Sequence, residues 1–330
     1  MALRWGIIGC GHIAKTFIAS AKQVSGAVLQ GCAASDYSRA VNFANEYGVT
    51  QAFKSYEQLY NSDDIDVVYI ATTHNFHFSQ AKACLLAGKH VLCEKPLTLN
   101  SHQATILFSI AEQHKLMLME AVWTRFLPAI SALKARLADN AIGNIKHLSA
   151  SFSLNRALPD DHRLLNKTLA GGALLDLGIY PITFADLVFD EAPVKVTGSA
   201  LMASTGVDEV SSYLLEYSDG RSATLSASFR MDAPVYGHIY GDRGRIVVPF
   251  FLGAQGFEIW VGDELIENYS APFEATQNFM FEISHFQQCI ENQEFASPVL
   301  PANTSIRVLS IMDELRAQWG LSYAGESSAG

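Results

Sequence analysis

Charged residues are scarce in this chain, and acidic residues outnumber basic ones. Asp, Glu, Lys and Arg together make up 17% of the 330 residues, and the formal net charge is -10 at pH 7. An anionic protein repels phosphate backbones instead of neutralising them. Nucleic acid is therefore not expected as a partner.

Long hydrophobic runs and paired cysteines are also lacking. The first apolar run, residues 5–10, is interrupted by glycine and is far too short to cross a membrane or form a signal-peptide core. The cysteines are five in number and scattered, which suits buried thiols in a reducing compartment. We expect a cytoplasmic protein that has no membrane partner and no disulfides.

The order of local patterns predicts an α/β fold with two domains. At 330 residues the chain exceeds the size at which one hydrophobic core usually stops growing. In residues 1–121, short apolar runs alternate with helical patterns, which is typical of a doubly wound parallel sheet. In residues 122–330, alternating strands are separated by turn signals after Pro193. This second part is predicted to be an α+β domain with a large, mostly antiparallel open sheet.

A glycine-rich turn follows the first predicted strand. Residues 7–14 read Ile-Ile-Gly-Cys-Gly-His-Ile-Ala, the G-x-G-x-x-A pattern between a strand and a helix. In dinucleotide-binding folds the first glycine makes a tight turn, the second lets the backbone approach the pyrophosphate, and the last small residue allows close packing. The helix N-terminus attracts the phosphates. We predict a Rossmann domain that binds NAD(P) through Gly9, Gly11, His12, Ile13 and Ala14.

The end of the second predicted strand distinguishes the two cofactors. An acid there binds the ribose 2′-hydroxyl of NAD, whereas a cation accommodates the 2′-phosphate of NADP. Ser35 and Arg39 together offer a hydroxyl and a guanidinium to a phosphate. Asp36 is the alternative, as a ribose ligand for NAD or simply as a helix cap. We predict that NADP is preferred.

Two further segments carry the candidate chemistry. Residues 88–96 form a predicted strand that ends in Glu94, Lys95 and Pro96, at the edge where open α/β sheets bind ligands. Residues 170–181 read Ala-Gly-Gly-Ala-Leu-Leu-Asp-Leu-Gly-Ile-Tyr-Pro, with Asp176 and Tyr180 four residues apart on one helical face. A tyrosine with a pKa near 10 needs a nearby cation to act as a base at neutral pH. Lys95 is the candidate cation. Taken singly, these residues also suit a surface lysine, a helix-surface acid and a core aromatic.

These segments together resemble the glucose-fructose oxidoreductase and inositol dehydrogenase family. Within it, the Glu-Ala-Val-Trp-Thr-Arg-Phe-Leu-Pro stretch at 120–128 and the Gly-Ile-Tyr at 178–180 are most similar to the dimeric dihydrodiol dehydrogenases, which also act as NADP-dependent D-xylose 1-dehydrogenases. The resemblance implies Tyr180 as acid or base, Lys95 and Asp176 beside it, and D-xylose or a trans-dihydrodiol as substrate. Two departures stand out: the inositol branch has histidine in place of Tyr180, and dihydrodiol relatives have arginine in place of Ser35.

Several other residues are expected near the ligands. Thr72, His74 and His77 follow a predicted strand, and the family resemblance implies that with Glu94 they line the nicotinamide pocket. Residues expected to contact substrate are Trp123, Arg125, Phe126 and Arg163, for which domain packing or loop solvation is the alternative. No metal site is expected, because the histidine pair lacks further ligands.

Two functions remain as alternatives to a sugar dehydrogenase. The same site suits a reductase of keto or anhydro sugars, because Tyr180 can donate a proton as well as accept one. A non-catalytic nucleotide sensor of the same fold is the other, although the presence of both Lys95 and Tyr180 argues against it.

A homodimer is expected through the open sheet of the second domain. In residues 221–230, apolar side chains alternate strictly with small hydroxyl side chains. The apolar set should face the helices of its own domain. The hydroxyl row then forms a flat, uncharged face onto which a second copy can pack.

Overall fold

Residues 2–156 and 158–326 are described by the computed structural model, and they divide into two compact units. The first unit contains residues 2–123 and 274–306, and the second contains residues 124–273 and 307–326. Residues 274–306 therefore return to the first unit. That residues 1–121 bind the cofactor, and that residues 122–330 bind the substrate and form the dimer, remains a prediction.

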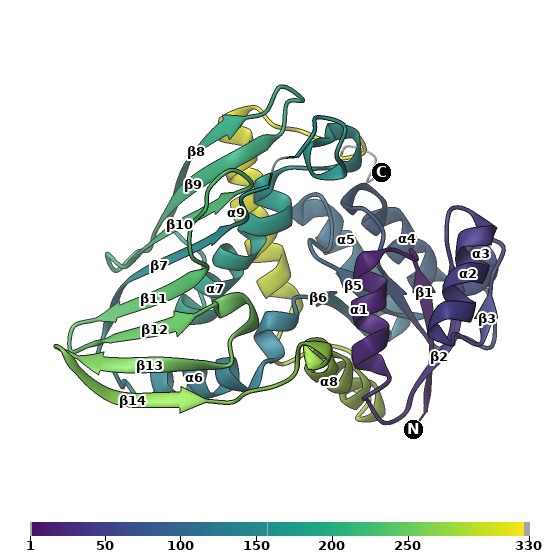
Figure 1. Ribbon diagram of the computed structural model, residues 1–330, viewed down its shortest axis with the longest axis horizontal. Coiled ribbons are helices and arrows are strands. Elements are labelled where there is room, and N and C mark those ends of the chain that lie inside the picture. Colours follow the sequence, from purple (N-terminus) through teal and green to yellow (C-terminus); the bar gives the residue numbers. More distant parts are fainter. Residues whose placement is uncertain (1, 157, 327–330) are drawn as a thin grey trace. The chain divides into compact units, whose positions relative to one another are not determined.

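The first unit is built on a six-stranded parallel sheet in the order β3-β2-β1-β4-β5-β6 (Figure 1). This is the Rossmann strand order, which reverses between β1 and β4 and so confirms the predicted doubly wound domain. The strands are β1 (Leu3–Ile8), β2 (Ala27–Ala33), β3 (Gln51–Ala52), β4 (Val67–Ile70), β5 (His90–Glu94) and β6 (Leu118–Ala121). The helices are α1 (His12–Ala21), α2 (Tyr37–Tyr47), α3 (Tyr56–Tyr60), α4 (His74–Leu86), α5 (Ser101–His114) and α8 (Met280–Glu291).

An aromatic cluster fills the core beside β1 and β4. Phe17 stacks on Tyr69 with 3.8 Å between the ring centroids, and Trp5 lies 5.3 Å from Phe17. Phe286 brings α8 into this cluster, 5.5 Å from Trp5. All four side chains are essentially inaccessible to solvent. The return of residues 274–306 therefore completes the core of the first unit.

The second unit contains an eight-stranded sheet in the order β14-β13-β12-β11-β7-β10-β9-β8. Only the β7–β10 pair is parallel, so the prediction of a mostly antiparallel sheet is confirmed. The strands are β7 (Ile145–Ser153), β8 (Lys195–Met202), β9 (Asp208–Glu216), β10 (Ser222–Ser228), β11 (Tyr236–Gly241), β12 (Arg245–Pro249), β13 (Gly256–Val261) and β14 (Glu264–Ser270).

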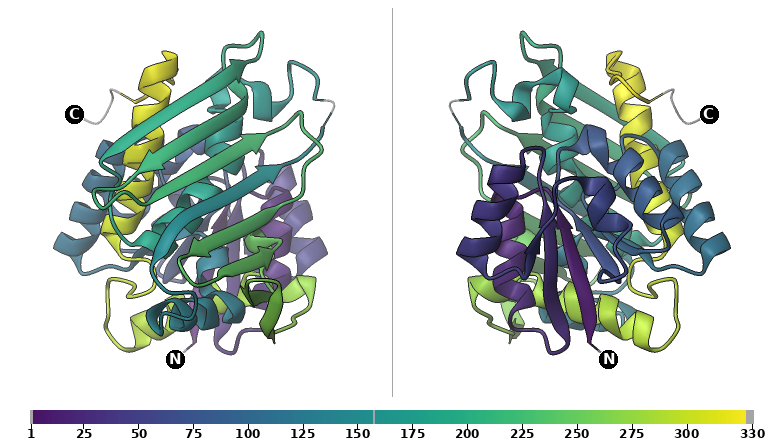
Figure 2. Two further views of the ribbon diagram at one scale, coloured as in Figure 1. Left: turned by 90° about the vertical axis from the view of Figure 1, so that its left-hand side faces the viewer. Right: turned by 90° about the vertical axis from the view of Figure 1, so that its right-hand side faces the viewer.

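Within the described part of the chain, helices cover one face of this large sheet and leave the other open. They are α6 (Pro128–Ala138), α7 (Ile179–Phe189) and the greater part of α9 (Ala302–Trp319), whose Leu315 and Trp319 pack against β8 (Figure 1). The left panel of Figure 2 looks onto the open face. One helical stretch, Lys167–Phe189, is long and apolar enough to cross a membrane, but 89% of its most apolar window is buried as core of the fold.

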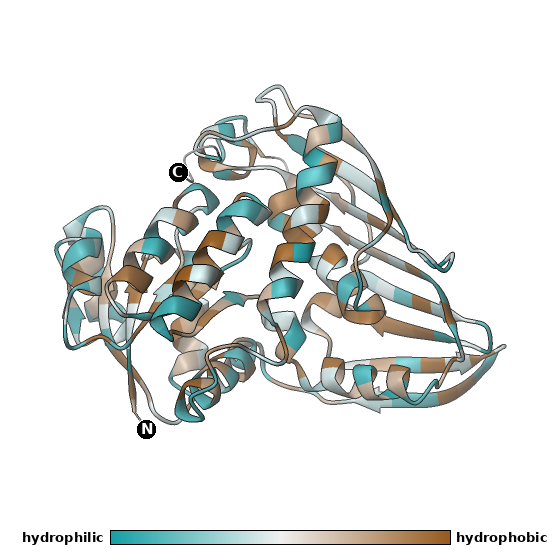
Figure 3. Ribbon diagram, turned by 180° about the vertical axis from the view of Figure 1, so that it is seen from behind, coloured by the Kyte–Doolittle hydropathy of each residue, from teal (hydrophilic) through white to brown (hydrophobic). Residues whose placement is uncertain are grey.

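Strand β10 has the alternation that the sequence predicts. Ala223, Leu225, Ala227 and the following Phe229 are buried, and hydrophobic and hydrophilic residues alternate along the strands of this sheet (Figure 3). Thr224 is exposed and Ser222 and Ser226 are half-buried. Ser228 differs from the other hydroxyls, because it is buried and its Oγ accepts hydrogen bonds from the amides of residues 230 and 231.

Candidate active site

The turn after β1 has the geometry of a phosphate loop. Gly9 has a φ of +96°, and a Cβ there would lie 2.7 Å from the carbonyl oxygen of Ala71 at the end of β4, so no other residue fits. Gly11 is the N-cap of α1, and a Cβ on it would have no atom within 4 Å, so the space before the helix is open. No side chain of the described residues caps α1. Its first N–H groups are thus available to an anion.

The remaining loop residues have the expected positions. His12 is exposed and Ile13 half-buried in the first turn of α1, whereas Ala14 is fully buried and lets the helix pack closely. These residues fit a dinucleotide pyrophosphate, because Gly9 packs closely on the end of β4 while a Cβ on Gly11 would meet no atom within 4 Å.

The end of β2 offers an exposed hydroxyl and an exposed guanidinium, those of Ser35 and Arg39. Asp36 caps α2: its Oδ1 accepts hydrogen bonds from the Ser38 amide at 2.7 Å and from the Ser38 hydroxyl at 2.6 Å. These bonds, with the charge of Arg39, lower the pKa of the Asp36 carboxyl. The capping role that the sequence left open for Asp36 is therefore present in the structure.

Buried contacts fix the Glu94-Lys95-Pro96 segment at the end of β5. The Tyr69 hydroxyl donates to Glu94 Oε1 at 2.6 Å, and the Lys95 amide lies 3.3 Å from Glu94 Oε2. Burial and the neighbouring Glu94 carboxylate raise the pKa of Tyr69 far above its ordinary value, so its hydroxyl remains a donor. The Lys95–Pro96 peptide bond is cis, and Lys95 is half-buried.

His77 connects the loop after β4 to the loop after β5. It is fully buried, with Nδ1 2.8 Å from the Pro96 carbonyl oxygen and Nε2 3.2 Å from the Thr72 carbonyl oxygen. Burial lowers the pKa of His77, and the charge of Lys95 adds to this effect, whereas the contacts with the two carbonyl oxygens oppose it. The His74 ring lies 5.8 Å from the His77 ring. His77 thus holds the two loops together.

In the second unit, Asp176 and Tyr180 lie on one continuous helical segment. The turn Leu174–Gly178 is a π-helix that leads directly into α7, where the sequence predicts a regular α-helix. Asp176 is half-exposed and Tyr180 is 8% exposed, whereas nearly all other side chains of the segment are buried. The Tyr180 ring meets Phe152 edge-on at 5.7 Å. Such π-helical turns occur frequently at functional sites.

The expected substrate residues have different surroundings. Trp123 is 8% exposed and packs 5.8 Å from Phe279 within the first unit. Arg125 is buried in the second unit, where its Nη1 lies 3.0 Å from Asp186 Oδ2. Phe126 is half-buried, and Arg163 is exposed on a short 3-10 helix. The ion pair gives Arg125 a structural role, and the substrate contacts of all four residues remain predictions.

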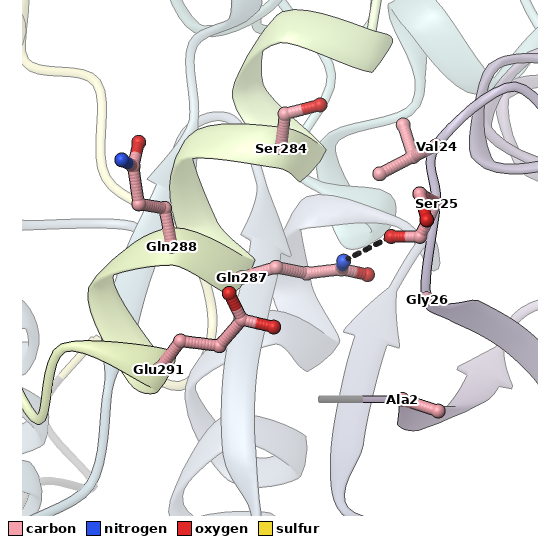
Figure 4. Close-up of a pocket in the computed structure, with 8 residues that line it drawn as sticks. All are labelled: Ala2, Val24, Ser25, Gly26, Ser284, Gln287, Gln288 and Glu291. Atoms are coloured by element: carbon pink, nitrogen blue, oxygen red, sulfur yellow. Dashed lines mark hydrogen bonds between the residues drawn. The ribbon is translucent and has the colours of Figure 1, made fainter.

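A polar cavity of about 600 Å³ lies at the opposite, amino-terminal end of β1 (Figure 4). Gln287 crosses it, donating to the Ser25 carbonyl oxygen at 3.0 Å and accepting from the Trp5 indole at 3.1 Å. Since this amide is satisfied by the protein itself, the cavity gives no indication of a ligand. Among the described residues, no group of three or more His, Cys, Asp and Glu side chains is placed to hold a metal ion.

Comparison with known proteins agrees with these features. Residues 3–122 match the model of an oxidoreductase family with an NAD-binding Rossmann fold, and residues 130–247 match the GFO/IDH/MocA C-terminal domain. The chain belongs to the GFO/IDH/MocA family. It is 35% identical to trans-1,2-dihydrobenzene-1,2-diol dehydrogenase of Xenopus tropicalis over 331 residues, covering 98% of this chain and 100% of the relative. The human enzyme of the same name is 33% identical over 334 residues, covering 98% of each chain.

Solved structures of the same fold carry both nicotinamide cofactors. A 3-ketoreductase from Actinomadura kijaniata, in complex with NADP and TDP-benzene, is 28% identical with a TM-score of 0.86, covering 96% of this chain and 98% of that one. A levoglucosan dehydrogenase in complex with NADH and levoglucosan has a TM-score of 0.87 over 97% and 98% of the two chains, but at 19% identity it shows the fold alone. This GFO/IDH/MocA chain is an NAD(P)-dependent oxidoreductase that acts on alcohol groups.

The GFO/IDH/MocA fold of this chain also relies on contacts that the motifs do not indicate. Tyr69 supports Glu94, as described above, and Glu120 of the 120–128 stretch accepts hydrogen bonds from the Leu97 amide at 2.8 Å and from the Ser305 hydroxyl at 2.6 Å. These partners lie between 23 and 185 residues apart in sequence. No local pattern could have shown them.

Proposed function

We propose that the protein transfers hydride between NADP and a sugar or a related cyclic alcohol. The expected reactions are the oxidation of D-xylose to its lactone and of a trans-dihydrodiol to a catechol. The observation that carries the proposal is the position of Tyr180 at the start of α7, four residues after half-exposed Asp176 of the π-helical turn, in a chain similar over its full length to dihydrodiol dehydrogenases.

The first domain would hold the cofactor. Gly9, Gly11, His12, Ile13 and Ala14 would receive the pyrophosphate at the N-terminus of α1. Ser35 and Arg39, both exposed, would bind the 2′-phosphate, because Asp36 is already used as a helix cap. Residues proposed around the nicotinamide are Thr72, His74, His77, Glu94 and Lys95. When bound, the cofactor supplies the hydride acceptor or donor.

Tyr180 would move the proton. During oxidation its phenolate takes the hydroxyl proton of the substrate, and during reduction its hydroxyl gives the proton back. A free tyrosine is too weak a base at neutral pH, since a pKa lower by roughly 3 units requires about 4 kcal/mol of differential stabilisation. The positive charge of Lys95 would supply part of this energy. Asp176 would orient the substrate hydroxyl groups.

The reverse reaction is the second candidate. Tyr180 would then donate a proton to the carbonyl of a keto or anhydro sugar. The similarity to the 3-ketoreductase favours this direction, and structures of that enzyme include variants with a lysine or a tyrosine replaced, the same residue types as Lys95 and Tyr180.

A coupled absorbance screen tests the proposal. Aldoses, polyols, keto sugars and trans-dihydrobenzenediol would be offered with NADP and with NAD. We expect turnover with D-xylose, the dihydrodiol or a close analogue. Cofactor binding without turnover of any compound would contradict the enzyme and favour the nucleotide sensor.

We infer further that the protein is a homodimer through the open face of the large sheet. A depression of about 510 Å³ on this face is lined by uncharged residues only, mainly the hydroxyl side chains of β7 to β10. Leu214, which lines it, exposes 36% of its surface, and Leu201 of β8 exposes 58%. A face of small hydroxyl and apolar groups suits a second sheet across a two-fold axis. Light scattering at micromolar concentration should give a dimer, and a monomer would contradict the inference.

A further inference from the structure

The turn that begins the Tyr180 segment is held by several buried groups of the second unit. The Gly171 and Gly172 amides donate to the carbonyl oxygens of Asn166 and Leu164 at 2.9 and 2.8 Å. A Cβ on Gly171 would lie 2.6 Å from the Leu164 oxygen, and one on Gly172, whose φ is +128°, would lie 2.5 Å from Asp208. The turn is therefore restricted to glycine at both positions.

Asp208 caps the helical segment that follows this turn. Its Oδ2 accepts hydrogen bonds from the Leu174 amide at 2.7 Å and from the Ser211 hydroxyl at 3.1 Å. The side chain is fully buried at the start of β9. Because helix N-termini leave their first amides without partners, this contact fixes where the Leu174–Gly178 turn begins.

The segment that follows α9 reaches the same turn. Helix α9 ends at Trp319, and residues 321–326, here called the C-terminal latch, follow it. The Tyr323 hydroxyl donates to the Gly171 carbonyl oxygen at 2.6 Å, and the side chain is 6% exposed. A Cβ on Gly172 would also lie 3.0 Å from this hydroxyl. The latch therefore touches the backbone nine residues before Tyr180.

The latch is anchored on α9 by charged groups. The Arg316 guanidinium lies over the Tyr323 ring at 5.3 Å and pairs with Asp313 at 2.8 Å and with Glu326. The Tyr323 amide donates to Glu326 Oε2 at 2.9 Å. Arg316 is almost completely buried, so these contacts are well shielded from solvent. They leave Tyr323 little freedom to move away from Gly171.

We propose that Tyr323 and Asp208 are positioning residues for the reaction, which hold the Gly171–Gly172 turn so that the helical segment presents Asp176 and Tyr180 to the substrate. This rests on the proposed role of Tyr180 as acid or base. The segment from the turn to Tyr180 is one continuous helix, so a shift of its first residues displaces the phenol. A displacement of about 1 Å at a reacting group can cost about 10²-fold in rate.

Tyr323→Phe tests the latch, because it removes the hydroxyl and keeps the ring under Arg316. Tyr217→Phe is the matched control: Tyr217 is 4% exposed and packs on Phe189 at the far end of α7. Loss of one buried hydrogen bond should speed hydrogen exchange of the amides of residues 171–176 by about tenfold. With NADP and trans-dihydrobenzenediol, kcat should fall roughly tenfold at an unchanged KM for NADP. The control should change neither quantity.

A double variant shows whether the latch acts through Tyr180. In a Tyr180→Phe background, Tyr323→Phe should lower kcat no further, because the group it positions is already gone. Glu326→Gln, which weakens the anchor without touching the turn, should change exchange and kcat in the same direction by a smaller factor. It serves as the second test if Tyr323→Phe folds poorly.

Unchanged hydrogen exchange at residues 171–176 in Tyr323→Phe would overturn the proposal that the latch holds the turn. So would faster exchange with normal kcat, or an equal loss of kcat in Tyr217→Phe. Normal turnover by Tyr180→Phe alone would instead overturn the proposed function, and with it the catalytic consequence of the latch.

Discussion

Replacing Glu282 by glutamine probes a buried carboxyl group in the first unit. Glu282 lies on α8, is fully buried, and neither of its carboxylate oxygens has a hydrogen-bond partner among the described residues. Burial, and then the negative charge of Glu94, raise the pKa of Glu282 well above its ordinary value. Ionisation there is costly, because a buried charge without a partner loses its hydration.

The direction of the pH effect follows from this shift. In the unfolded chain the carboxyl has a pKa of about 4.3. As the pH rises, the unfolded chain therefore loses this proton before the folded protein does. The contribution of Glu282 to stability is complete below that pH and is lost as the pH rises toward the pKa in the fold. While the group stays protonated in the fold, the loss is about 1.4 kcal/mol per pH unit. Glutamine does not titrate, so the variant lacks this slope.

Urea unfolding at pH 6, 7 and 8 measures the effect. The free energy of unfolding of the native protein should fall relative to that of Glu282→Gln as the pH rises from 6 to 8, by at most about 1.4 kcal/mol per pH unit. Glu112→Gln on α5 is the control, because this carboxylate of the same unit is exposed, and its curve should run parallel to that of the native protein. Parallel curves for Glu282→Gln as well would refute the reasoning.

Three other outcomes follow from the proposed site and interface. Arg39→Ala should lower kcat/KM for NADP about tenfold while leaving NAD nearly unaffected, because the guanidinium would bind only the 2′-phosphate; a native enzyme that prefers NAD tenfold or more would contradict this and assign Asp36 to the ribose. Lys95→Met should lower kcat by about 10²- to 10⁴-fold in the coupled assay, and a normal kcat would remove Lys95 from the chemistry. Ser226→Arg should dissociate the dimer in light scattering, because it places a charge in the uncharged depression, and a fully associated variant would exclude that face as the interface.

The sequence predicts those parts of the fold that depend on local patterns. The alternation of strands and helices and the glycine turn at Gly9 identify the Rossmann sheet. Strands that are buried on both faces appear as short apolar runs, and a backbone with positive φ favours glycine. The alternation along β10 likewise shows which side of the large sheet is covered.

Other parts of the structure have no local sequence pattern that predicts them. Strand β3 has two residues, too few for any periodicity, and the π-helical turn at Asp176 looks like an ordinary helix in sequence. The contacts of Tyr323 with Gly171, or of α8 with the aromatic core, join residues more than 150 positions apart. The motifs therefore identify which residues are candidates for chemistry, whereas the groups that hold them in place become visible only in the structure.

The pH dependence of kcat for the native enzyme and for Tyr180→Phe tests the central claim most directly. With saturating NADP and trans-dihydrobenzenediol, replacing the phenol should lower kcat by about 10²- to 10⁴-fold, the usual contribution of general acid-base catalysis. The native profile should show an ionisation that the variant lacks, and cofactor binding measured by fluorescence should stay unchanged. Near-normal turnover by Tyr180→Phe across the pH range would contradict the assignment of Tyr180 as the acid or base.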